Sequence, residues 1–279
     1  MVVILSILRS ALVIMTPLLF AAIGGLFPAL AGTLNIALEG LLLAGAFSGL
    51  AAFYYTGNIA AAITAAVITS LLLSGLIAYF SFSLRSNIII IGLAANLLSG
   101  GICVIFSERL FGTKGVIAPG NGFNMPEVFP WYLYVACVLL LLSWVLIYKT
   151  PFGYRLRACD KHSIALVSLG IKPDFYRFTA FMICGLYCGI GGSFLSLYLG
   201  AFVPGMSAGK GWIALVIIFL GSRRPRGVLA AAFIFAFAEA VSNHVQGFWR
   251  IPADFILAFP FICTLVAMIF VSIKAKFVE

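Results

Sequence analysis

The fold class is decided by the stretch IAAAITAAVITSLLLSGLIAYF, residues 59–80, in which no side chain is charged. About 20 consecutive apolar residues are enough for a helix to cross the hydrocarbon core of a bilayer. Comparable runs recur along the 279 residues, of which 63% are hydrophobic and only 9% are charged. A soluble domain usually has about a quarter of its residues charged. The sequence therefore predicts an all-α polytopic membrane protein, folded as a single transmembrane domain over residues 1–279.

Apolar runs of this kind divide the chain into nine predicted membrane segments. They are residues 3–26, 35–56, 58–84, 87–112, 129–148, 174–200, 210–222, 227–247 and 252–273. The seventh segment is short for a bilayer-spanning helix, so we expect either a broken helix or a helix partly buried in protein. An odd number of spans would place the two ends of the chain on opposite sides of the membrane.

The net charge of +9 raises the question of nucleic-acid binding. The basic residues stand singly or in small groups between apolar segments, so we expect no nucleic-acid partner. Cytoplasmic loops of membrane proteins are enriched in Lys and Arg. With the C-terminus placed in the cytoplasm, most of the 17 basic residues fall in cytoplasmic loops: Arg85, Lys149, Arg155, Arg157, Lys161, Lys172, Arg177, Arg223, Arg224, Arg226, Lys274 and Lys276.

The longest predicted cytoplasmic loop is residues 149–173. Within it, Asp160 or Ser163 could cap a short helix, and Gly170 is placed to end that helix. The helix would carry an apolar face formed by Ile164, Leu166, Val167 and Leu169. Such a face could lie on the membrane surface, or it could dock in a groove of a cytoplasmic partner. The loop by itself leaves both interpretations open.

Two polar residues open the second predicted segment. Asn35 and Glu39 are four residues apart, so we expect them to share one helix face. They follow the Gly- and Pro-containing run GGLFPALAGT, residues 24–33, and interruptions of this kind mark solute sites in transporters. Glu39 could instead cap the N-terminus of its own helix at the membrane interface, where the helix dipole favours an anion.

Other polar residues in predicted spans are few. Asn96 stands beside small residues in the fourth segment, which suits close helix packing or the lining of a pathway. Glu239 is a second carboxylate in a predicted span. We take Asn35, Glu39 and Asn96 as the candidate translocation pathway. There is no Walker A, HExxH or GxSxG motif and no CxxC pair, so we expect neither enzymatic activity nor a metal site in this chain.

A family resemblance is carried by three stretches: GTLNIALEGLLLAGAF (32–47), LRACDKHSIALVSLGI (156–171) and GMSAGKGWIALVIIFLGSRRPRG (205–227). They are similar, in order and spacing, to signatures in the permease subunits of ATP-binding cassette (ABC) importers for simple sugars and nucleosides. These subunits form a branch of the branched-chain amino acid/ribose-type permease family. The resemblance extends over residues 32–240, which is most of the chain.

The resemblance implies that residues 156–171 form a coupling helix that docks on an ATP-binding subunit. Most of the family pattern is present, but Asp160, Lys161, His162 and Ser163 stand where the family usually has Gly-x-Asn-Pro, so the local helix start could differ. The residues expected to couple to the ATPase are Arg157, Ala158, Asp160, Ala165, Leu169, Gly170 and Ile171.

The resemblance also implies a set of partners. A second permease subunit, identical or homologous, would complete the pathway, and an extracellular or periplasmic binding protein would deliver the solute. ATP and Mg would bind the partner ATPase, with no cofactor on this chain. The implied location is the bacterial inner membrane, and the implied solute is a nucleoside, a simple sugar or a riboflavin-like vitamin. The alternative is an ion-coupled secondary transporter, for which only Glu39 and Glu239 are available as intramembrane coupling groups.

Overall fold

A computed structural model describes residues 2–118 and 128–246, and over these ranges it is helical apart from loops and one isolated β-bridge. Seven helices in these ranges are long and apolar enough to cross a membrane. They are α1 (Val2–Leu30), α2 (Leu38–Thr56), α3 (Ile59–Ala78), α4 (Ile88–Phe111), α5 (Phe129–Lys149), α8 (Pro173–Leu199) and α10 (Pro225–Gln246). The π-helical turn η1 (Tyr79–Ser83) continues α3. The shorter helices are α6 (Pro151–Lys161), α7 (Ser163–Ser168) and α9 (Lys210–Leu220).

The first eight predicted segments all correspond to helices in the described residues. The seventh segment is α9, whose 11 residues rise about 16 Å, roughly half of a hydrocarbon core of about 30 Å. The ninth predicted segment, residues 252–273, lies outside the described residues. The all-helical membrane fold is therefore established, and the total of nine spans stays a prediction.

Helix boundaries follow from local sequence. Asn58 and Asn87 cap α3 and α4, because each side chain accepts a hydrogen bond from the backbone N–H two residues later. Gly57, Gly112 and Gly200 end α2, α4 and α8 in the left-handed conformation that glycine adopts without strain. At Gly57 and Asn58 the two signals are adjacent, so α2 and α3 are joined by a short connection.

Helix α8 is the centre of the bundle and packs against α1, α2 and α3. Its glycines make this possible, since a Cβ at Gly189 would come within 2.6 Å of the Cα of Val67 on α3. The close approach also allows an interhelical hydrogen bond, in which Ser74 Oγ of α3 donates to the Phe181 carbonyl at 2.6 Å. Small residues and polar contacts of this kind join helices inside membranes.

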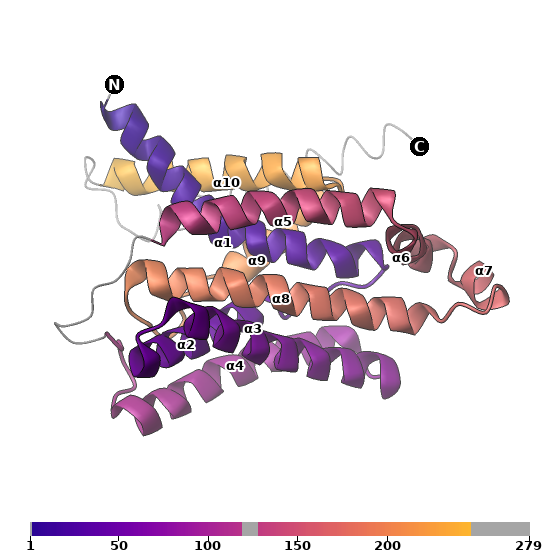
Figure 1. The fold of residues 1–279 in the computed structure, drawn as a ribbon, viewed down its shortest axis with the longest axis horizontal. Helices are drawn as coiled ribbons and strands as arrows, with labels where there is room; N and C mark the ends of the chain where they lie inside the picture. Colours follow the sequence, from indigo (N-terminus) through magenta and orange to yellow (C-terminus); the bar gives the residue numbers. More distant parts are fainter. Residues whose placement is uncertain (1, 119–127, 247–279) are drawn as a thin grey trace.

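The short helices α6 and α7 lie together at one end of the bundle, and the N-terminus of α1 lies toward the other end (Figure 1). The prediction of one short helix within residues 149–173 was wrong in this respect, because α6 and α7 are separate and meet at His162. Asp160 lies inside the last turn of α6 and caps nothing there, and Ser163 begins α7 without capping it. Thr150 caps α6 instead, by accepting from the N–H of Gly153.

Candidate functional site

Two non-helical segments interrupt the bundle. Residues 31–37 separate α1 from α2, and residues 200–209 separate α8 from α9. The second segment turns through Gly205 (φ +74°), Ala208 (φ +46°) and Gly209 (φ +81°) before α9 begins. Non-helical backbone at membrane depth is tolerated only where it is surrounded by protein or lines a cavity. The polar groups of these segments therefore need partners within the protein.

Glu39 joins the two interruptions. It lies in the first turn of α2, and its carboxylate reaches the N-terminus of α9. Oε1 accepts from the N–H of Gly209 at 2.8 Å, and Oε2 accepts from the N–H of Gly211 at 2.7 Å. A Cβ at Gly211 would overlap the backbone of Glu39, so glycine is required for this approach. The anion also faces the positive end of the α9 dipole.

This contact lies inside the membrane-spanning part of the bundle. Helix α9 is only 11 residues long, and it appears midway between the two ends of the bundle in Figure 1. Its C-terminal end leads to Arg223, whose Nη1 donates to the carbonyl of Ala29 near the end of α1 at 3.5 Å. Glu39 is therefore not the interfacial cap of its own helix that was one of the two interpretations; it caps a different helix.

Asn35 and Asn96 satisfy the backbone around the start of α2. Asn35 is buried; its Oδ1 accepts from the N–H of Ala37, and its Nδ2 lies 3.3 Å from the sulfur of Cys184. Asn96 Oδ1 accepts from the N–H of Gly40 at 2.7 Å, and Asn96 Nδ2 donates to the Ile36 carbonyl at 3.0 Å. The expectation that Asn35 and Glu39 share a helix face was wrong, because Asn35 lies in the non-helical segment.

Lys210 adds a positive charge next to this contact. Its Nζ lies 4.0 Å from Glu239 Oε1 on α10, with both side chains mostly buried. Glu39 and Glu239 are thus both engaged, Glu39 by backbone amides at the start of α9 and Glu239 by Lys210. Among the described residues there is also no group of three or more His, Cys, Asp and Glu side chains that could hold a metal ion.

The three candidate pathway residues therefore share one structural role. Each forms hydrogen bonds with backbone N–H or carbonyl groups next to a break between helices. Together these bonds fix how α2, α4 and α9 meet. Sequence reasoning missed Gly209 and Gly211, the partners of Glu39. A signal was available in the glycine-rich stretch GMSAGKGW, residues 205–212, because glycines next to a short helix indicate close backbone approach.

The predicted coupling segment projects from the end of the bundle that is predicted to be cytoplasmic. On and just after α7, Ile164, Val167 and Leu169 have exposed fractions of 83%, 62% and 74%, whereas Leu166 is buried. Ala165 is exposed beside them, and Gly170 follows with φ +74°. Three large apolar side chains at the tip of the molecule form what we call the tip surface, Ile164, Val167 and Leu169.

The base of the segment is held against the bundle. Arg157 lies over the rings of Tyr148 and Tyr154, with its guanidinium carbon 4.9 and 5.0 Å from the ring centroids. Ala158 and Ile171 are partly buried and pack against the core. Burial raises the pKa of the Cys159 thiol, against a smaller opposing effect of the Arg177 charge, so this side chain stays uncharged at neutral pH.

Asp160 connects α6 to the turn between α9 and α10. Its Oδ2 lies 3.2 Å from Arg223 Nη1, the same nitrogen that reaches the Ala29 carbonyl. Arg177 makes a parallel link, donating to the carbonyls of Ala31 at 3.4 Å and Cys159 at 3.2 Å. Two of the loops predicted to be cytoplasmic, residues 149–173 and the turn at Arg223, thus meet at one end of the molecule.

A comparison with protein families shows which family this chain belongs to. Residues 7–268 match the family described as branched-chain amino acid transport system / permease component. The chain belongs to this family. This permease is 32% identical to the guanosine ABC transporter permease protein NupQ of Bacillus subtilis, over 95% of this chain and 92% of NupQ. It is 27% identical to the nucleoside ABC transporter permease protein NupC of Lactococcus lactis, over 94% and 90% of the two chains.

Two further proteins extend the comparison. TsgC13 of Haloferax volcanii, provisionally named a glucose ABC transporter permease protein, is 28% identical over 83% of this permease and 75% of its own length. The solved structure of PsaBC from Streptococcus pneumoniae in complex with Fab has a chain with a TM-score of 0.56 at 16% identity, covering 94% of this permease and 90% of that chain. That likeness concerns the fold alone. The chain is a permease of an ABC transporter, as the sequence predicted, and the ion-coupled alternative is set aside.

Proposed function

We propose that this permease forms one half of a nucleoside pathway in an ATP-driven importer of the bacterial inner membrane. The observation that carries the proposal is the similarity to the guanosine and nucleoside permeases NupQ and NupC over at least nine-tenths of the chain. A second permease subunit completes the pathway, and an extracellular binding protein delivers the solute. A separate ATP-binding subunit binds ATP and Mg and docks on the tip surface.

The contacts at the cytoplasmic end suggest how ATP binding reaches the pathway. Movement of α6 and α7 pulls on Asp160, which is paired with Arg223 at 3.2 Å. Arg223 follows the C-terminal end of α9, and the N-terminal end of α9 is held by Glu39. A short helix fixed at both ends would transmit a shift from the coupling segment to the start of α2. Bundles that respond in this way switch between discrete packings.

The solute is tested by uptake of radiolabelled guanosine into cells that depend on this transporter. We expect deletion of the permease gene to reduce uptake to background, and excess unlabelled adenosine, but not excess glucose, to compete. An ATPase-inactive partner subunit serves as the control for energy dependence. Competition by glucose and not by nucleosides would contradict the nucleoside assignment while leaving the transporter class intact.

Exchanging the charges of Asp160 and Arg223 tests the proposed transmission. An exposed or partly exposed ion pair contributes at most about 1 kcal/mol to stability, so Asp160→Arg and Arg223→Asp should each fold normally. We expect each single variant to lower uptake several-fold, because like charges then face each other between α6 and the turn that follows α9. The double variant restores the opposite charges and should recover most uptake. If it remains as impaired as the single variants, the pair does not transmit movement.

A further inference from the structure

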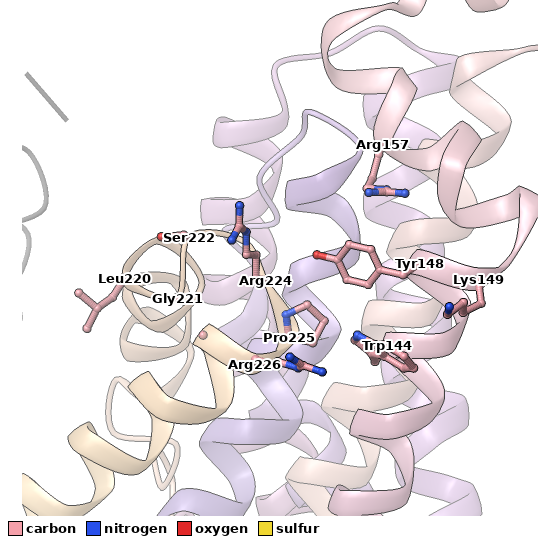
Figure 2. Close-up of a pocket in the computed structure, with 11 residues that line it drawn as sticks. Trp144, Tyr148, Lys149, Arg157, Leu220, Gly221, Ser222, Arg224, Pro225 and Arg226 are labelled. Atoms are coloured by element: carbon pink, nitrogen blue, oxygen red, sulfur yellow. The ribbon is translucent and has the colours of Figure 1, made fainter. Parts of the chain in front are cut away.

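A cavity of about 840 Å³ opens at the cytoplasmic end, between the end of α5, the base of α6 and the turn that joins α9 to α10. Four basic side chains line it: Lys149, Arg157, Arg224 and Arg226. None of the described residues that line it is acidic. In Figure 2, Arg224 extends from the turn before α10 and Arg226 from the first turn of α10, and Arg157, Tyr148 and Trp144 lie across the cavity from them. The cavity is therefore suited to an anion.

Among the described residues, no acidic side chain neutralises the positive charge of the cavity. Over residues 2–118 and 128–246, none of these four side chains forms an ion pair. Lys149 lies over the ring of Trp144, 5.8 Å from its centroid, and Arg157 lies over two tyrosine rings. Helix α10 begins at Pro225, so the positive end of a 22-residue helix points to the same place.

A second cavity, of about 270 Å³, continues from the first along the groove between α5 and α10. The two share Trp144, Pro225 and Arg226. Beyond these, the groove is lined by leucines: Leu140, Leu141 and Leu229. A basic cavity at the end of the spans thus continues directly into an apolar groove that runs toward the middle of the membrane.

We propose that these two cavities form a binding site for an anionic phospholipid of the cytoplasmic leaflet. The phosphate headgroup lies among Arg157, Arg224 and Arg226, and one acyl chain follows the leucine groove. Basic pockets between spans on the cytoplasmic side suit anionic headgroups, and aromatic side chains such as Trp144 are favoured at that depth. A free soluble anion would use the basic cavity but would have no contact with the groove.

The test is native mass spectrometry of the purified full-length permease in detergent, titrated with phosphatidylglycerol or with phosphatidylcholine. We expect phosphatidylglycerol to bind more tightly. Removing one arginine near the surface should weaken binding about fivefold, so the double variant Arg224→Gln/Arg226→Gln should lose about 30-fold. The matched control Arg85→Gln/Lys172→Gln removes the same charge from the cytoplasmic end outside the cavity, and it should bind normally.

A second pair of variants tests the groove. Leu141→Trp fills it and should lower phosphatidylglycerol affinity, whereas Leu142→Trp, the next residue on α5 and not part of the groove, should not. Equal binding of the two lipids, or unchanged binding by Arg224→Gln/Arg226→Gln, overturns the proposal. Displacement by millimolar inorganic phosphate with no effect of Leu141→Trp assigns the cavity to a soluble anion and also overturns it. A dimer that forms without lipid and is lost in Leu141→Trp assigns the groove to a second copy of the chain.

Discussion

Replacing Glu39 by glutamine is expected to remove most solute uptake while the chain still inserts and assembles. The carboxylate accepts two hydrogen bonds from the N-terminus of α9, at 2.8 and 2.7 Å. Glutamine keeps one acceptor but turns an NH₂ group toward a backbone N–H, so one charge-assisted bond is lost. Such a bond is worth about 1.5–3 kcal/mol, which changes a two-state equilibrium by more than about tenfold. We therefore expect uptake to fall at least about tenfold.

The control for this variant is Glu108→Gln, which removes a carboxylate that is exposed and paired with Lys114 at 3.3 Å. It should transport normally, because an exposed pair contributes little. Membrane abundance and co-purification with the ATPase distinguish a transport defect from misfolding. Uptake by the Glu39→Gln variant at the level of the unmodified permease would show that the contact between α2 and α9 has no part in transport.

Introducing two carboxylates into the tip surface, as Ile164→Glu/Leu169→Glu, is expected to abolish co-purification of the ATP-binding subunit. These side chains are 83% and 74% exposed, so the permease itself loses little packing. On docking, each would bury an apolar side chain, at about 1.5–3 kcal/mol, and a carboxylate in the same place would cost free energy. A loss of affinity of at least about 100-fold should follow, measured by pull-down from detergent.

The matched control is Tyr55→Glu, which places a charge at an exposed aromatic position outside the tip surface. Tyr55 is 60% exposed and lies in the last turn of α2. It should leave the ATPase bound. Gly170 is less suitable for this test, because its φ of +74° means that any side chain there strains the backbone as well as changing the surface. Recovery of the ATPase with both variants would place the docking surface elsewhere on the cytoplasmic side.

The long helices could be predicted from the sequence because the signal is local. A charge-free run such as residues 59–80 has few alternatives to a spanning helix. The short seventh segment, which is α9 in the structure, could also be predicted, since its apolar run is too short to span a membrane. The start of α2 was harder. The side chain of Asn35 accepts a hydrogen bond from the N–H of Ala37. A side chain that bonds the backbone two residues later stabilises a non-helical turn in place of the helix that the periodicity predicts.

The contacts that define the candidate site could not be predicted from local sequence. Glu39 and Gly209 are 170 residues apart, and Asp160 and Arg223 are 63 apart. Intramembrane polarity singled out Glu39, Asn35 and Asn96, but it could not distinguish a pathway lining from side chains that satisfy an interrupted backbone. That distinction depends on which helix end faces which side chain, and therefore on the packing of the whole bundle.

The close approach of α8 to its neighbours limits how this chain can vary as it is inherited. A Cβ at Gly185 would come within 2.8 Å of the Ser70 carbonyl oxygen, and one at Gly189 within 2.6 Å of Val67. Most single-nucleotide changes in those codons would therefore separate α8 from α3 and be removed by selection. At Leu97, which is 79% exposed, an apolar replacement would disturb no such contact within the chain. Diverging lineages should accumulate differences on the outside of the bundle and keep the seam between α3 and α8.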